Sequence, residues 1–258
     1  MTSNLLATVV GKSLKEFTRE RMVIFWTYAV PLFFLAVLPM MYGEAPAEVV
    51  SRLKGSLTLT MVTFLVMTAG QSNLPGSIAM DAERGLYLKM ASMPVSPWKE
   101  SLGRIFATWI FSLVGAVLML SVGLLYGAVF EGSLTDILAA AGFSFLTVVA
   151  SVGVGLITAS LVKGESAATH TGVAMTLLTY FLGGMALPYS NLPLVLRYFA
   201  RLHPIPSANA MMISLLEGEA YVGYNPLNMA QVALTVSSST LILLVGLTLY
   251  SKLCWRKD

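Results

Sequence analysis

The sequence predicts an all-α membrane protein with six transmembrane helices. The composition is 56% hydrophobic and 11% charged, whereas soluble domains carry roughly 25% charged residues. The charges are concentrated in short segments between long uncharged runs, and six of these runs reach the roughly 20 residues that cross a bilayer. A seventh run, 202–216, has only 15 residues and contains Pro204 and Pro206. We therefore expect that run not to cross the membrane.

The first segment, 1–21, is expected to lie along the membrane surface. Leu6, Val10, Leu14 and Phe17 fall near one helical face, and the charged residues lie largely on the opposite face. This pattern is typical of an amphipathic helix in the headgroup layer. A solvated tail is the alternative interpretation.

Six spans follow, and the distribution of basic residues predicts their orientation. The spans are expected at about 22–43, 55–80, 98–130, 134–162, 166–188 and 226–251. Twelve of the 16 Lys and Arg residues lie on the side of the termini, and four lie on the other side. The positive-inside rule therefore predicts a protein of the cell membrane with both termini in the cytoplasm. The net charge of +3 reflects this orientation and does not indicate a nucleic-acid partner.

Spans two and five contain the polar residues that are most informative about function. Polar side chains are costly in lipid, so we expect those near the end of span two to face other helices or a cavity. Two interpretations remain open for them: hydrogen bonds between helices, or a substrate pathway. The candidate pathway residues are Gln71, Ser72, Asn73, Thr176, Thr179 and Tyr180.

Between spans five and six, segment 189–216 contains two short helical patterns separated by prolines. Leu194 and Tyr198 in the first pattern, and Met211 and Met212 in the second, are apolar enough to enter the outer leaflet. We therefore expect an extracellular re-entrant helical segment.

The sequence lacks the patterns of an enzyme or of an ion-coupled pump. Gly11-Lys12-Ser13 resembles the end of a phosphate-binding loop, but Leu6 occupies the position of its first glycine. His170 and His203 are too few and too far apart for a metal cluster. The membrane-depth part of each span lacks Asp, Glu, Lys and Arg, which ion-coupled transporters usually place there. We expect no catalysis, metal or cofactor in this chain and an energy source outside it.

The cytoplasmic segment between spans two and three, 81–104, holds seven of the 29 charged residues. We expect a short helix over 82–93, because Asp81 and Glu83 would suit the positive end of its dipole and Pro94 would stop it. The next helix would start at Pro97.

An apolar ridge is predicted along this short helix. Leu86, Met90 and Met93 fall at i, i+4 and i+7 and are flanked by charge. Such a ridge stabilises nothing in water, but it fits a groove on a partner protein.

The segment resembles the cytoplasmic segment of ABC-2 type permeases, the membrane subunits of ATP-binding-cassette exporters. In that family, an acid-x-Glu-Arg-Gly start is followed by a basic residue and then by a small-x-Pro-Val sequence. The matching positions are Asp81, Glu83, Arg84, Gly85, Lys89, Met93, Pro94 and Val95. Ala82 and Leu86 depart from the pattern. The basic amphipathic start, the six-span layout and the proline-rich outer segment extend the similarity to nearly the whole chain.

The resemblance implies that 82–93 is a coupling helix seated in a cleft of an ATPase subunit. It also implies a unit of two permeases and two ATPases among membrane lipids, with this chain as a homodimer and with ATP and Mg on the ATPase. The candidate contacts with the ATPase are Asp81, Glu83, Arg84, Gly85, Leu86, Lys89, Met90 and Met93.

The expected function is therefore export of a hydrophobic or amphipathic molecule, such as a drug-like compound or a lipid. The 26 aromatic residues among 258 do not favour a glycan exporter. The alternatives are a stand-alone channel or secondary transporter without an ATPase partner, and a membrane scaffold.

Overall fold

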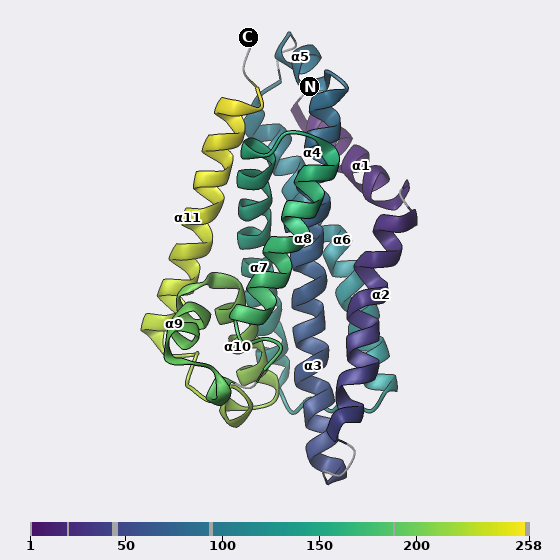
Figure 1. Cartoon of the computed structure of the whole chain (residues 1–258). Helices are drawn as coiled ribbons and strands as arrows, with labels where there is room; N and C mark the ends of the chain where they lie inside the picture. The colour runs from purple at the N-terminus through teal and green to yellow at the C-terminus, as the bar shows by residue number, and fades with distance from the viewer. Residues whose placement is uncertain (1, 20, 43–45, 93–94, 188, 256–258) are drawn as a thin grey trace.

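The chain forms a bundle of long helices that run side by side. The computed structural model describes residues 2–19, 21–42, 46–92, 95–187 and 189–255, and the regular elements among them are helices. Both termini and α5 lie at one end of the bundle, and α9 and α10 lie toward the other (Figure 1). We call these the α5 end and the α9 end. The elements are α1 Thr2–Arg19, α2 Arg21–Val37, η1 Leu38–Tyr42, α3 Ala47–Met67, η2 Thr68–Asn73, α4 Leu74–Glu83, α5 Leu86–Ala91, α6 Pro97–Leu125, α7 Leu134–Leu161, α8 Glu165–Leu182, η3 Tyr189–Asn191, α9 Leu194–Leu202, α10 Pro204–Leu216, η4 Glu219–Tyr221 and α11 Met229–Leu253.

Among the described residues, five stretches are long and apolar enough to cross a membrane. They are Val23–Met40, Ala47–Glu83, Pro97–Leu125, Leu134–Leu161 and Met229–Leu253. The expected fifth span, 166–188, corresponds to α8, which has 18 residues and includes Glu165 and His170. Because all 18 residues of α8, including these two polar ones, count toward its mean hydropathy, that mean is too low for α8 to be one of the five. The count of six spans therefore stays a prediction.

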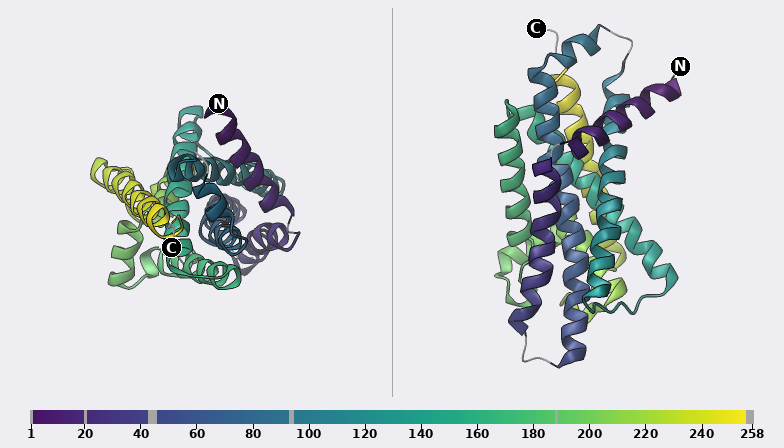
Figure 2. Two further views of the ribbon diagram at one scale, coloured as in Figure 1. Left: turned by 90° about the horizontal axis from the view of Figure 1, so that it is seen from above. Right: turned by 90° about the vertical axis from the view of Figure 1, so that its right-hand side faces the viewer.

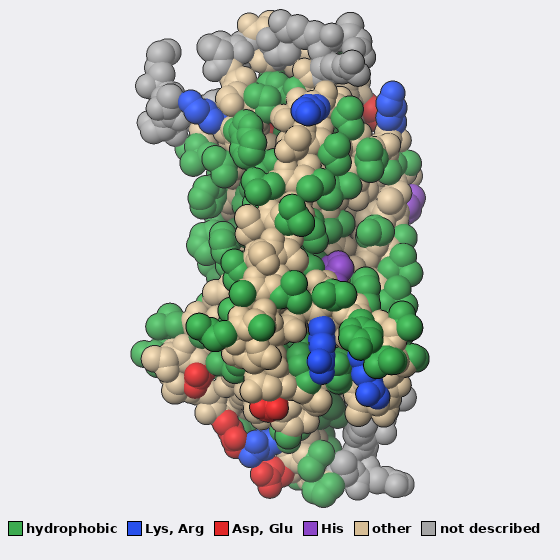
Figure 3. All heavy atoms as spheres, turned by 90° about the vertical axis from the view of Figure 1, so that its left-hand side faces the viewer, with side chains coloured by type: hydrophobic (Ala, Val, Ile, Leu, Met, Phe, Trp, Pro, Cys, Tyr) green, Lys and Arg blue, Asp and Glu red, His purple; other side chains and the backbone are tan. Residues whose placement is uncertain are grey.

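The surface pattern agrees with a membrane-embedded bundle. Hydrophobic side chains cover the middle of the face seen in Figure 3, and charged side chains gather toward its two ends. Such an apolar band is large for a soluble monomer, whose exposed apolar patches are usually limited to a few hundred Å².

The N-terminal helix α1 crosses α6 obliquely (Figure 2). Its buried line is Val9, Ser13 and Phe17, so Val10 and Leu14 of the predicted face are only partly buried. The ring of Phe17 packs 5.3 Å from that of Phe111 on α6. The predicted apolar face is thus largely used against the protein, and the position of α1 in the headgroup layer stays a prediction.

Span two is a single long rod with a change of helix type in the middle. The α-helix α3 passes into the π-helical turn η2, and α4 then continues to Glu83. Helix α8 packs closely against this turn, because a Cβ at Gly172 would lie 2.6 Å from the Cα of Ser72. Pi turns inside α-helices occur frequently at functional sites, and this one contains the polar residues singled out in span two.

Segment 81–104 differs from the predicted helix over 82–93. Helix α4 runs on to Glu83, the chain turns at Arg84 and Gly85, and α5 has only six residues. Gly85 has φ +69°, a left-handed conformation that suits glycine at a helix end. Asp81 and Glu83 therefore lie at the end of one helix and not at the start of another, where the helix dipole would favour them. The end of α4 at Glu83 was not predicted, because α4 continues span two without a break.

Segment 189–216 contains two α-helices, as the two predicted patterns suggest, but the two helices differ in burial. Leu194 and Tyr198 of α9 are exposed, whereas Met211 and Met212 of α10 are buried in the protein. Both methionines contact other helices and not lipid, because α10 packs along α7 in the core. Whether the segment re-enters the bilayer stays a prediction.

Candidate functional site

At the α5 end, charged side chains of α1, α4 and α6 form one group, which we call the charge cluster; Asp81, Glu100 and Arg104 are buried in it, whereas Lys12 and Glu16 are partly buried. It consists of Lys12, Glu16, Asp81, Glu100 and Arg104. Arg104 is only 1% exposed, and its guanidinium pairs with both Asp81 and Glu100. Lys12 also pairs with Asp81 at 2.5 Å and with Glu16 at 2.8 Å. Each buried charge thus has an opposite partner, as burial in a low-dielectric interior requires.

Two tyrosines extend the charge cluster to α5 and α11. The hydroxyl of Tyr87 accepts a hydrogen bond from Arg104 Nη2 at 3.3 Å. The hydroxyl of Tyr250 donates to Glu100 at 2.5 Å and lies 3.0 Å from the hydroxyl of Tyr87. Burial raises the pKa of Tyr87, so its hydroxyl stays neutral. The short helix α5 is therefore fixed to two other helices, α6 and α11, through a single side chain.

A second link joins the end of α4 to α8. Glu83 Oε1 accepts a hydrogen bond from the backbone N–H of Glu165 at 3.2 Å. This N–H opens α8, where a carboxylate both satisfies a free donor and interacts favourably with the helix dipole. A movement at the α4–α5 turn would therefore act directly on α8.

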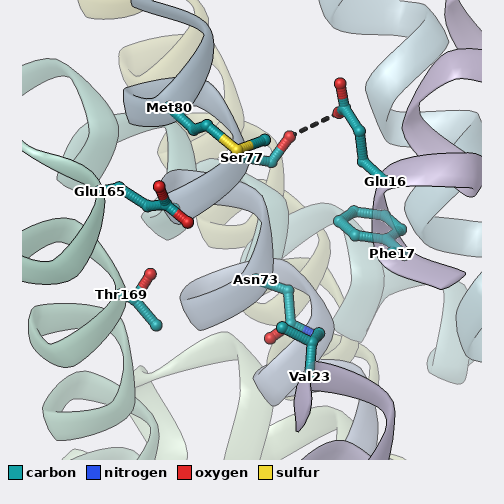
Figure 4. A pocket seen from close by; sticks show the side chains of 9 residues that line it. Glu16, Phe17, Val23, Asn73, Ser77, Met80, Glu165 and Thr169 are labelled. Carbon is teal, nitrogen blue, oxygen red and sulfur yellow. Dashed lines mark hydrogen bonds between the residues drawn. The ribbon is translucent and has the colours of Figure 1, made fainter. Parts of the chain in front are cut away.

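A small cavity lies beside the charge cluster, between α1, α2, α4 and α8 (Figure 4). Ser77 donates to Glu16 across it at 2.8 Å. Asn73 also lines it, and its side-chain amide donates to Thr27 of α2 at 3.0 Å. Asn73 thus joins η2 to α2, and it lines the same cavity as Glu16 and Phe17.

Two of the predicted pathway residues line a different cavity, which we call the apolar cavity. It has a volume of about 290 Å³, and its lining is almost entirely apolar. Ser72 and Thr176 contribute to it from facing helices. The complete lining is Trp26, Val30, Phe64, Thr68, Ser72, Val173, Thr176 and Leu177.

The other pathway candidates surround the apolar cavity without lining it. Gln71 is fully buried and accepts a hydrogen bond from Thr176 at 3.4 Å. Thr179 and Tyr180 are buried further along α8, and the ring of Tyr180 stacks on that of Phe34. Among the described residues, the Gln71 amide nitrogen and the Tyr180 hydroxyl have no hydrogen-bond partner. Buried donors without partners are rare and mark places where another group can bind.

The candidate ATPase contacts differ strongly in exposure. Glu83, Arg84 and Lys89 are exposed. Gly85, Leu86 and Met90 are partly buried. Asp81 is buried inside the charge cluster, and Met93 lies outside the described residues. The exposed apolar side chain of α5 is Leu88, 64% exposed, which the predicted ridge did not include.

The charge cluster itself was not predicted from the sequence. Arg104 was counted only as a cytoplasmic charge. Glu100 and Arg104 are four residues apart at the start of a span, and this spacing was the available signal for a paired charge inside the helix. The partners from α1 and α11 have no local signal, because 84 or more residues separate them from Glu100 and Arg104 in the sequence.

Comparisons with known proteins agree with this architecture. The family model described as ABC-2 type transporter matches residues 4–216. A comparison with curated proteins gave no match. The family implies that an ATP-binding-cassette ATPase is the partner of this membrane domain and that ATP is hydrolysed on that separate subunit. Since the matched range covers most of the 258 residues, the chain belongs to the ABC-2 type transporter family and is a multi-pass membrane domain of an ABC-type transporter.

Proposed function

We propose that the chain is the permease subunit of an exporter that moves a hydrophobic or amphipathic molecule, drug-like or lipid, out of the cell. A separate ATPase would bind ATP and Mg, and this chain would bind no cofactor. The observation that carries the proposal is the charge cluster, since it fastens the short helix α5 to α4, and α4 is continuous with the π turn η2 that lines the apolar cavity.

The proposed coupling route starts on the exposed residues Glu83, Arg84, Leu88 and Lys89. They project from the α4–α5 turn and from α5, in the segment where the family resemblance places the coupling helix. Two links run inward from it: Tyr87 to the charge cluster, and Glu83 to the first residue of α8. Helix α8 supplies three residues to the apolar cavity, so movement of α5 would reach the cavity through it.

The apolar cavity supports a hydrophobic substrate. Its lining is almost entirely aromatic and aliphatic, because the hydroxyls of Thr68, Ser72 and Thr176 donate to other groups of the protein. Predominantly apolar walls are typical of sites that hold a hydrophobic small molecule. We propose that two copies of the chain meet at this face, because α2 and α8, which line the cavity, carry the exposed aromatic side chains of Phe25, Trp26 and Phe181.

We further propose that α8 is the sixth span. Its 18 residues extend about 27 Å at 1.5 Å per residue, close to the roughly 30 Å of hydrocarbon. It runs alongside the other long helices, and the termini share one end of the bundle (Figure 1), which an even number of spans requires. In this arrangement the α5 end is cytoplasmic, and the α9 end is outside the cell membrane.

The experiment is ATP hydrolysis by the reconstituted complex of the chain with its ATPase. Replacing Glu83→Gln and Arg84→Gln together should abolish stimulation by substrate, with the permease still folded and bound to the ATPase. The control Lys99→Gln changes an exposed cytoplasmic charge away from α5 and should leave stimulation intact. Normal stimulation in the double variant would refute the coupling assignment.

A stand-alone channel or secondary transporter is distinguished by its partner. Purification in mild detergent at native expression should yield an equal amount of a second protein with a phosphate-binding loop. If the purified chain moves solute without such a protein, the exporter proposal is wrong.

A further inference from the structure

Glu217 is a buried carboxyl group at the α9 end, far from the charge cluster. Its side chain follows directly after α10 and is only 3% exposed. Neither of its carboxyl oxygens has a hydrogen-bond partner among the described residues. An ionised carboxylate in such a place is strongly unfavourable, because it has lost water without gaining a donor.

The carboxyl group of Glu217 lies near a backbone acceptor, the carbonyl oxygen of Val129. It lies against Gly55 of α3, where a Cβ would fall 2.7 Å from the Cδ of Glu217 and 2.9 Å from the carbonyl oxygen of Val129. The carboxyl group of Glu217 and the carbonyl oxygen of Val129 thus border the same small space beside Gly55. An ionised carboxylate can only accept hydrogen bonds, whereas a protonated one can donate to a carbonyl.

Arg52, the cation that acts on Glu217, is already paired with two other carboxylates. Arg52 donates to Glu131 at 2.8 Å and pairs with Glu48 at 3.4 Å. The backbone N–H of Glu131 donates to the carbonyl of Leu216 at 2.9 Å, which holds this ion pair beside Glu217. In this conformation Arg52 therefore pairs with Glu131, and Glu217 has no counter-ion among the described residues.

The remaining charges around Glu217 do not supply a partner. The Lys54 ammonium donates to the carbonyl of Tyr126 at 2.9 Å, and Asp136 is engaged with Ser133 at the start of α7. The charged or titratable groups on the surrounding elements are Glu48, Arg52 and Lys54 of α3, Glu131 of the α6–α7 connection, Asp136 of α7, and Glu219 and Tyr221 of η4.

We propose that Glu217 is a proton-binding site at the α9 end of the bundle. The carboxyl group holds a proton in the conformation of this structure, which allows the end of α10 to pack against α3. Loss of the proton creates a buried charge that needs Arg52 or water, so it favours separation of α10 from α3. The proton site stands by itself; only its placement outside the cell rests on the proposed function.

The direction of the pKa shift agrees with the geometry. Burial raises the pKa of Glu217 to about 8, Arg52 lowers it, and Glu131 raises it further. Between the usual value of 4.5 and about 8, the folded protein holds a proton that the unfolded chain has released. Stability must therefore fall as the pH rises through this window, which is the reverse of the behaviour of a salt-bridged carboxylate.

The test uses the purified full chain in detergent and compares wild type with Glu217→Gln. Infrared spectra of wild type should contain the absorption of a protonated carboxyl at pH 7, and it should disappear with a midpoint near pH 8. Glu217→Gln should lack this band. The control Glu219→Gln, an exposed glutamate two residues further on, should keep it.

Thermal unfolding gives a second readout. Wild type should lose stability between pH 5 and pH 8, with its unfolding constant rising by up to about tenfold per pH unit relative to Glu217→Gln. Equal pH dependence of the two proteins would overturn the proposal. If Glu217→Gln does not accumulate, the wild-type infrared titration decides alone, and the absence of the band at pH 7 overturns it.

Discussion

Replacing Arg104 by methionine removes the shared partner of two buried carboxylates. The guanidinium pairs with Asp81 and Glu100, donates to Ser77 at 3.0 Å and to Tyr87 at 3.3 Å, and is only 1% exposed. Removing one partner of a buried ion pair costs about 3–5 kcal/mol, because the remaining charge is left uncompensated. Lys12 still reaches Asp81, so Glu100 is the carboxylate that loses most.

The loss can be measured by thermal melting of the detergent-purified chain. At about 2–4 °C per kcal/mol for a chain of this size, Arg104→Met should melt about 10 °C lower than wild type. The control Arg84→Met changes an exposed arginine and should differ by less than about 2 °C, since surface substitutions stay within about 0.5 kcal/mol.

A variant with a neutralised charge cluster distinguishes the stability lost through uncompensated buried charge from the stability lost through poorer packing. The triple variant Asp81→Asn, Glu100→Gln and Arg104→Met removes the uncompensated charges and should regain most of the stability. An Arg104→Met protein that melts with wild type would refute the view that this network holds the α5 end together. A triple variant no more stable than the single one would assign the loss to packing.

Three further outcomes follow from the close contacts around η2 and α5. Gly172→Val forces α8 away from the backbone of Ser72 and should cost about 1–3 kcal/mol in thermal melts, whereas Gly142→Val, which has no atom within 4 Å of its Cβ, should not. Gln71→Leu removes a buried amide nitrogen that has no partner among the described residues; it should change stability by less than about 1 kcal/mol but lower substrate-stimulated ATP hydrolysis. Gly85→Ala places a Cβ in a left-handed turn, should cost about 1–2 kcal/mol, and should weaken stimulation by more than it weakens basal hydrolysis.

Long apolar helices were predictable from the sequence, because uncharged length alone identifies them. Five of the six predicted spans correspond to stretches that can cross a membrane. Helix ends were less predictable, since Asp81 was expected just before a helix over 82–93. In the structure, Asp81 lies inside α4 and is neutralised by Arg104 of α6 and Lys12 of α1.

The candidate site was predictable only where local pattern determines it. Gln71, Ser72 and Thr176 come together because polar side chains in apolar helices must face protein or a cavity. The partnership of Arg104 with Tyr87 and Tyr250 depends on tertiary packing, so single-sequence reasoning had no means to find it. Glu217 was likewise only a charge that ended an apolar run, and its burial comes from the packing of α10 against α3 and α7.

The π turn Thr68–Asn73 changes which residues of span two lie on the same face of the helix. A π turn contains one residue more than an α turn, and each residue of an α-helix advances by about 100°. The rotational phase of α4 is therefore offset from that of α3, so a periodicity count carried straight through 47–83 places Ser77 and Asp81 on the wrong side. The number of residues in this turn decides where Asp81 points. A one-residue deletion there would rotate it away from Arg104 while every contacting side chain remained in the sequence.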